Sequence, residues 1–269
     1  MENNARDKDG RRWSLGELMH NLFIQSQVFV GMIAVLLSME TRAILRMGSA
    51  PLPFYWLVFF LTIFAYNLYY FPSGKYRLSL PMTMVSALGA LLCFLFLPDK
   101  PIGWLLLMGS LSIIYEIPSF LKVPRLQAYT LFKPLLLTAI WMLCTYFWPA
   151  RQAPVDDTFM FYGLYRLLFL FITIFHFHVR DEVKQENARP YHTVLILLHL
   201  ILIFLAAWIS LSIHQNTGMI YLGMSVVYLL VSFYFMIRRR SEYAYTFGID
   251  GMLFLQAIFV LLELNLTFT

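Results

Sequence analysis

Nine apolar stretches, each close to the length of a membrane span, follow one another along the chain with only short polar breaks between them. A transmembrane helix needs roughly 20 predominantly apolar residues. The stretches cover residues 22–39, 54–71, 80–97, 102–121, 127–148, 159–178, 192–213, 217–236 and 246–267. The sequence therefore predicts an all-α polytopic membrane bundle. Residues 1–21 would form a cytoplasmic N-terminal segment, and residues 22–269 a single domain of nine transmembrane helices.

The composition agrees with a membrane environment. Hydrophobic residues make up 60% of the chain and charged residues 13%, whereas soluble domains average about 25% charged residues. A soluble core built from 269 residues cannot hide this much apolar surface. A soluble or disordered protein is therefore excluded as an interpretation, and the continuous apolar stretches argue against a transmembrane β-barrel.

Lysine and arginine are distributed unevenly between the two sides of this nine-span arrangement. Fourteen of the 20 fall on the side of the N-terminus and four on the other side. Because cytoplasmic loops are enriched in Lys and Arg, the N-terminus is predicted to be cytoplasmic and the C-terminus to lie outside. The net charge of +5 then reflects loops that face anionic lipid head groups rather than nucleic acid.

A few ionisable residues lie inside the predicted spans, where they are costly and often functional. They are Glu116, Lys133, Arg166, Asp250 and Glu263. Glu40 and Arg42 directly follow the first span and dilute its apolar character. His176 and His178, two residues apart on a helix, point in different directions, so they are not expected to hold one metal ion together.

Polar groups also gather where three of the predicted spans reach the cytoplasmic face. The second span ends in Thr62-Ile-Phe-Ala-Tyr-Asn67, the fourth runs through Tyr115-Glu-Ile-Pro118, and the sixth ends in Val179-Arg-Asp181. Three loops that carry Asn, Asp, Lys and Arg would enclose an anion at the membrane surface.

These segments, together with Ile249-Asp-Gly251 in the ninth span, resemble the UbiA prenyltransferase superfamily, in particular a divergent bacterial branch of it. The resemblance extends from about residue 28 to 262, and a nine-helix bundle with a cytoplasmic N-terminus fits it. It implies a lipid-embedded enzyme that binds a prenyl diphosphate through Mg²⁺ held by two aspartate-rich loops. The prenyl group would be transferred to an aromatic or other lipophilic acceptor.

The resemblance also implies the residues of the site. Candidates for binding the diphosphate or the metal are Asn67, Asp181, Lys75, Arg77, Lys122, Arg125 and Arg180. Candidates for the prenyl pocket, whose aromatic faces would stabilise an allylic cation, are Tyr66, Tyr70, Tyr115 and Phe177. Asp181 is the expected metal ligand if Mg²⁺ is bound, and no catalytic residue is assigned.

The chain departs from the family at most of the acid positions. In the first motif, NDxxDxxxD, Asn67 is present, but Leu68, Phe71 and Lys75 stand where the family has aspartates. In the second motif, DxxDxxxD, Asp181 is present, but His178 and Gln185 replace the other two. Mg²⁺ is therefore expected as a cofactor only if the protein is active, and otherwise none.

Three functions remain open at this point. The first is a UbiA-like membrane protein that binds an isoprenoid or another lipid, with catalysis reduced or lost. The second is an active prenyltransferase, and the third is a small membrane transporter, which is less favoured because the spans lack the paired broken helices of inverted-repeat carriers. The expected partners are the lipid bilayer and a prenyl diphosphate or other anionic amphiphile, with no nucleic acid. The sequence names no protein partner.

Overall fold

The computed structural model describes residues 26–70, 79–121, 131–182, 189–212, 215–237 and 245–268. Within these ranges all regular structure is helical, which confirms the all-α class. The α-helices are α2 (Val28–Ile44), α3 (Leu52–Tyr70), α4 (Ser79–Phe96), α5 (Ile102–Leu121), α7 (Phe132–Met142), α8 (Asp157–Glu182), α9 (Arg189–Ser212), α10 (Gln215–Ile237) and α12 (Gly251–Phe268). Two π-helical turns, η2 (Leu143–Phe147) and η4 (Thr246–Asp250), continue α7 and precede α12.

Four segments are long and apolar enough to cross a bilayer. They are Asp157–Arg180, Pro190–Leu211, Asn216–Ile237 and Thr246–Leu264. The remaining apolar helices are shorter over their described residues. Many large apolar side chains on the long helices face outward, and Leu211 of α9 is 87% exposed. These features are compatible with a membrane protein.

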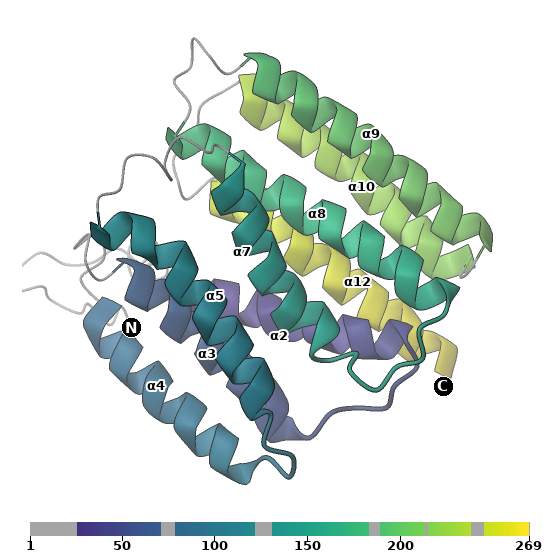
Figure 1. The fold of residues 1–269 in the computed structure, drawn as a ribbon. Coiled ribbons are helices and arrows are strands. Elements are labelled where there is room, and N and C mark those ends of the chain that lie inside the picture. The colour runs from purple at the N-terminus through teal and green to yellow at the C-terminus, as the bar shows by residue number, and fades with distance from the viewer. Residues whose placement is uncertain are drawn as a thin grey trace, which may run out of the picture. The chain divides into compact units, whose positions relative to one another are not determined.

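The chain forms two compact units, which are described separately. The first comprises residues 1–32 and 52–97, and the second residues 33–51 and 98–269. In the first unit α3 packs along α4 (Figure 1). Gly31 of α2 lies so close to Phe59 of α3 that a Cβ there would be 2.9 Å from its ring, and Gly89 of α4 meets Phe60 in the same way. Close packing in this unit therefore depends on glycine.

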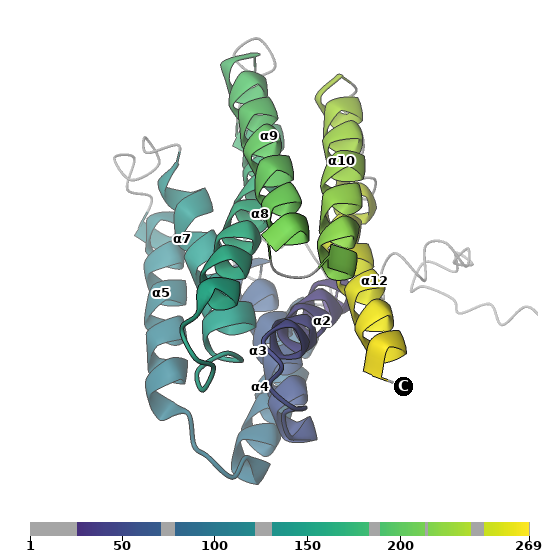
Figure 2. The ribbon, with the colours of Figure 1, turned by 90° about the vertical axis from the view of Figure 1, so that its right-hand side faces the viewer.

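In the second unit α9 packs along α10, α8 contacts both α7 and α9, and α12 contacts α10 (Figures 1 and 2). The largest fully buried side chains there are mostly aromatic: Trp148, Tyr146, Tyr162, Tyr165, Tyr221, Tyr228, Phe169 and Phe175. Four of these residues lie on α8, so α8 is the central helix of the unit's core. Buried tyrosines bring hydroxyl groups into the core, and each of these groups needs a hydrogen-bond partner.

Local sequence explains where several helices begin. Proline occurs in the first turn of α3, α4, α7 and α9, where its missing N–H costs no hydrogen bond. Before α8, the Asp156 side chain accepts a hydrogen bond from the Phe159 N–H at 2.8 Å and so caps the helix.

The end of the first predicted span was wrong. The predicted span ends at residue 39, before a glutamate, but α2 continues to Ile44 and carries Glu40 and Arg42 within it. A charged residue marks the end of a span only if its charge stays unpaired, and the charge of Glu40 is neutralised inside the second unit.

Candidate functional site

A fully buried ion pair lies in the core of the second unit. Nη2 of Arg166, on α8, is 2.6 Å from Oε2 of Glu40, on α2, and neither side chain is exposed. The Arg166 guanidinium also lies over the ring of Tyr162, one turn earlier on α8, at 5.1 Å from its centroid. Its Nη2 donates a hydrogen bond to the Tyr162 hydroxyl as well. The two opposite charges cancel, so this part of the core is close to neutral.

Polar side chains from two further helices complete the coordination of Glu40. The Tyr221 hydroxyl of α10 donates to Oε1 of Glu40 at 2.7 Å, and Nε2 of Gln256 on α12 donates to the same oxygen at 3.3 Å. Tyr165 of α8 donates to Oε1 of Gln256 at 3.0 Å, and its hydroxyl lies 3.1 Å from Oγ of Ser225. We call Glu40, Arg166 and these four partners (Tyr162, Tyr165, Tyr221 and Gln256) the Glu40–Arg166 cluster.

Arg166 does not use all of its donors in this cluster. Among the residues that the structure describes, none forms a hydrogen bond with its Nε or Nη1 atoms, although both are buried. The π-helical turn η2 contributes at the edge of the cluster, where the backbone oxygen of Thr145 accepts a hydrogen bond from Thr41 at 2.8 Å. Local π-helical geometry often occurs at functional positions.

Sequence reasoning identified one member of this ion pair and missed the other. Arg166 stands out because it is a charge inside a predicted span, whereas Glu40 was assigned to the end of a shorter first span. The sequence signal for this ion pair was that Glu40 and Arg166 carry opposite charges in otherwise apolar surroundings. Only the packing of α2 against α8 and α10 could show that they meet, because the two residues are far apart in the sequence.

A second buried polar group lies farther along α8. Nε2 of His176 is 2.5 Å from Oγ of Ser232 on α10, and the same oxygen is 2.8 Å from Nε2 of His199 on α9. Nδ1 of His199 is 2.7 Å from the backbone oxygen of Leu195. All three side chains are buried, and we call them the histidine cluster. The pairing of His176 with His199 was not predicted from the sequence.

These groups form a stripe along one face of α8. Tyr162, Arg166, Thr173, His176 and Arg180 are three to seven residues apart, and such spacings return to the same side of a helix. From Tyr162 to Arg180 the stripe covers about 27 Å at 1.5 Å per residue, which is close to the ~30 Å hydrocarbon thickness of a bilayer. The sequence predicts polar groups mainly at the helix ends, whereas the structure adds buried ones in the middle of α8, from Tyr162 to His176.

At the C-terminal end of the stripe, Arg180 contacts two aromatic rings. Its guanidinium carbon lies 5.0 Å from the ring centroid of Phe177 and 5.0 Å from that of Tyr245. The structure thus brings together two residues predicted from the sequence, Phe177 and Arg180, and adds Tyr245, which was not predicted. Tyr245 also donates a hydrogen bond to the backbone oxygen of Phe235 at 3.2 Å, so its ring is held in place from a third element.

Asn67, predicted from the first motif, lies in the first unit and is fully buried. Its Nδ2 donates to the backbone oxygens of Ser26 at 3.0 Å and Ile63 at 2.9 Å, so the side chain ties the start of α2 to α3. No described residue forms a hydrogen bond with its Oδ1. Asn67 therefore has a structural role through Nδ2, and its Oδ1 is still able to accept a hydrogen bond.

The structure describes only some of the other residues predicted for the site. Tyr66 on α3 and Tyr115 on α5 are half-buried. Asp181 lies in the last turn of α8 and Tyr70 at the end of α3, but both side chains are outside the described residues. Lys75, Arg77, Lys122 and Arg125 also lie outside the described residues.

At two of the positions where the UbiA superfamily has aspartates, the described side chains offer no carboxylate oxygen for Mg²⁺. Mg²⁺ prefers oxygen ligands, usually carboxylates, but Leu68 is an apolar side chain that is 41% exposed, and His178 offers nitrogen atoms. Across the described part of the chain, no group of three or more His, Cys, Asp or Glu side chains is arranged to hold a metal ion.

Comparisons with known proteins gave no match. No family model matches the chain, and neither the curated proteins nor the solved structures give a match.

Proposed function

We propose that this chain is a nine-span integral membrane protein of UbiA-like architecture that binds an isoprenoid or another lipid with an anionic head group, with catalysis reduced or lost. Its N-terminus lies in the cytoplasm and its C-terminus outside, in a bacterial inner membrane. Support comes from the apolar helices, from the uneven distribution of Lys and Arg, and from the order of the segments that resemble the UbiA superfamily.

The observation that carries the proposal is the position of Arg180. Contact with the rings of Phe177 and Tyr245, both at 5.0 Å, restrains a planar guanidinium at the end of an apolar helix. A guanidinium binds phosphate or carboxylate through two parallel hydrogen bonds, and a restrained one loses less entropy on binding. The head of an amphiphile would bind at Arg180, while its tail would lie along the apolar helices.

The two alternatives have less support. Magnesium-dependent prenyl transfer needs carboxylates at positions where this chain has Leu68, Phe71, Lys75, His178 and Gln185. A transporter of larger solutes has no specific observation in its favour. The buried hydrogen-bonded groups along α8 favour transport only for protons, which move between such groups without an open channel.

The first prediction is that Arg180 is needed for binding and Mg²⁺ is not. Purified full-length protein should bind a labelled farnesyl diphosphate equally in Mg²⁺ and in EDTA. Arg180→Gln should weaken binding about tenfold or more, because a hydrogen bond to a charged group contributes roughly 1.5–3 kcal/mol.

Arg151→Gln is the matched control for this experiment. Arg151 is also an arginine of the second unit, but it is partly exposed and pairs with Asp99 at 3.3 Å. Its replacement should leave binding unchanged. Absence of binding in both Mg²⁺ and EDTA would contradict the proposal, and release of diphosphate only with Mg²⁺ would support the prenyltransferase instead.

A further inference from the structure

The π-helical turn η4 brings Asp250 to the same side as Tyr245, the residue whose ring contacts Arg180. The backbone N–H of Gly251 donates to the backbone oxygen of Thr246, five residues earlier, and this spacing defines a π-helix. Residues five apart in such a turn return to the same face. Tyr245 and Asp250 are five apart, so Asp250 lies on the face of η4 that Tyr245 turns toward Arg180.

Packing against two helices holds this turn in place. Gly248 in η4 lies so close to α10 that a Cβ there would be 2.4 Å from the ring of Phe235. The ring centroid of Tyr245 is 4.6 Å from that of Phe235 and 6.1 Å from that of Phe177 on α8. Contacts with both α8 and α10 therefore set the position of Asp250 relative to Arg180.

The Asp250 carboxylate is an acidic group inside an apolar segment, Thr246–Leu264, that is long enough to span a membrane. Among the residues that the structure describes, none forms a hydrogen bond or an ion pair with it. Its side chain is half-buried, and the opposite charge of Arg180 attracts it. Ionisable groups within membrane spans are costly and often functional. A carboxylate with unused acceptors at this place can bind a ligand that brings hydrogen-bond donors.

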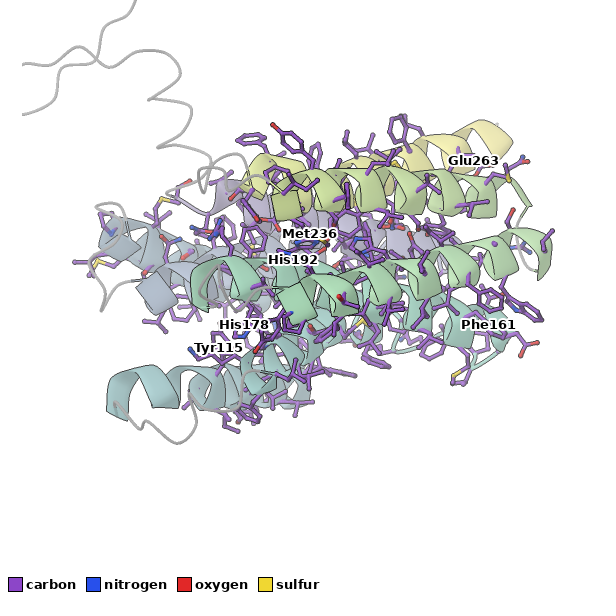
Figure 3. The ribbon with its side chains drawn as sticks, turned by 90° about the horizontal axis from the view of Figure 1, so that it is seen from above. Tyr115, Phe161, His178, His192, Met236 and Glu263 are labelled. Atoms are coloured by element: carbon purple, nitrogen blue, oxygen red, sulfur yellow. The ribbon has the colours of Figure 1, made fainter. Side chains whose placement is uncertain are left out.

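Arg180 and Asp250 thus offer a positive and a negative group at one end of the second unit. His178, close to Arg180 on α8, and Met236 lie toward this end, and Glu263 lies toward the other (Figure 3). A purely anionic head group would be attracted by Arg180 and repelled by Asp250, because like charges repel at short range. A head group that joins a phosphate to a primary ammonium gains from both residues.

We propose that the lipid bound at Arg180 is an aminophospholipid of the phosphatidylethanolamine type, with its phosphate on Arg180 and its primary ammonium on Asp250. This inference rests on the proposed function and deepens it, because it names the head group. A guanidinium suits the phosphate through paired hydrogen bonds, and a primary ammonium has three donors for the carboxylate. The trimethylated ammonium of phosphatidylcholine has no N–H, so it cannot donate a hydrogen bond to Asp250.

Titration with short-chain lipids tests the proposal. Dihexanoyl phosphatidylethanolamine, phosphatidylcholine and phosphatidic acid are each added to purified full-length protein in detergent, and thermophoresis measures the binding. The wild-type protein should bind phosphatidylethanolamine about tenfold more tightly than either of the others. Phosphatidylcholine lacks the hydrogen bond between charged groups, and phosphatidic acid lacks the ammonium.

Asp250→Asn should change the binding of two ligands in opposite directions. Phosphatidylethanolamine should bind about tenfold more weakly, because its ammonium loses a counter-charge. Labelled farnesyl diphosphate should bind more tightly, because a repelling charge is removed. A change of opposite sign cannot come from a general loss of folded protein.

Glu263→Gln is the matched control for Asp250→Asn. Glu263 is a carboxylate of the same segment, Thr246–Leu264, but lies at its other end. Its Oε2 accepts a hydrogen bond from Thr217 at 2.9 Å, and a glutamine oxygen can accept the same bond. Glu263→Gln should bind both ligands like the wild type.

The proposal is overturned if phosphatidylethanolamine binds no more tightly than phosphatidylcholine or phosphatidic acid. It is also overturned if Asp250→Asn binds both ligands like the wild type or loses both, since Asp250 would then not act on the ammonium. Failure of the proposed function looks different. In that case the wild-type protein binds neither farnesyl diphosphate nor any of the phospholipids, or Arg180→Gln binds them all unchanged, and both proposals fall together.

Discussion

Glu40 and Arg166 place two full charges where neither has access to water. Removing a charge from water costs several kcal/mol, which is recovered only when a partner and further hydrogen bonds are in place. Tyr162, Tyr221 and Gln256 supply those hydrogen bonds. Replacing one partner of the ion pair should therefore cost more stability than replacing both partners, and unfolding experiments can measure this difference.

Replacing one partner should destabilise the protein far more than replacing both. We expect Glu40→Gln to lower the free energy of unfolding by about 3–5 kcal/mol, since it leaves the Arg166 charge buried without a counter-charge. The double variant Glu40→Met with Arg166→Met should lose much less. Thermal or denaturant unfolding of the full chain in detergent measures both.

The exposed pair between Asp99 and Arg151, at 3.3 Å, provides the control. Asp99→Asn should change the stability by less than about 1 kcal/mol, because water screens exposed pairs. The coupling of the buried charges would be contradicted if the double variant Glu40→Met with Arg166→Met lost as much stability as Glu40→Gln alone.

At the scale of the helices, α8 and α10 carry matching polar stripes. Tyr221, Ser225, Tyr228 and Ser232 follow one another on α10 at helical spacing, and three of them contact polar groups of α8. The packing of α9 along α10 aligns the third component, His199, with Ser232. The position of α9 relative to α10 is therefore essential for the histidine cluster.

Gly218 determines how closely α9 and α10 approach each other at one end. A Cβ on Gly218 would overlap the backbone of Ser210 on α9, which cannot rotate away as a side chain can. We expect Gly218→Ala to destabilise the protein by about 1–3 kcal/mol, a typical cost of overpacking. Unfolding in detergent, with the mobility of α9 followed by a spin label, measures the effect.

Gly223→Ala is the matched control on the same helix. A Cβ there meets no atom within 4 Å, so alanine should be neutral or stabilise α10 by up to about 1 kcal/mol, as expected for Gly to Ala in a helix. Equal effects of the two substitutions would show that α9 and α10 do not approach closely at Gly218.

At the scale of the whole molecule, the number of membrane crossings decides on which side of the membrane each loop lies. Four described segments satisfy the length and composition of a span, whereas the positive charges favour nine crossings. With nine crossings, the loops before and after α4 lie on opposite sides of the membrane; if α4 does not cross, they lie on the same side.

Labelling of single cysteines distinguishes these counts. In a background with Cys93 and Cys144 replaced by serine, Lys75→Cys should react with a membrane-impermeant maleimide only from the cytoplasmic side, and Lys100→Cys only from the outside. The measurement is made in intact cells and in inverted membrane vesicles. Labelling of both positions from the same side would refute nine crossings.

The sequence by itself determined the all-α class and the approximate position of each described helix, because an apolar run of about 20 residues in a membrane satisfies its backbone groups as a helix. The prediction of residues 102–121, for example, coincides with α5. It also predicted Phe177 and Arg180 as site residues, which lie within a single turn of α8. Only the tertiary structure decided that Glu40 meets Arg166, that His176 shares Ser232 with His199, and that Tyr245 contacts Arg180. Each of these contacts joins helices distant in sequence, and the free energy that fixes them arises from packing and from the pairing of buried charges, which no local pattern encodes.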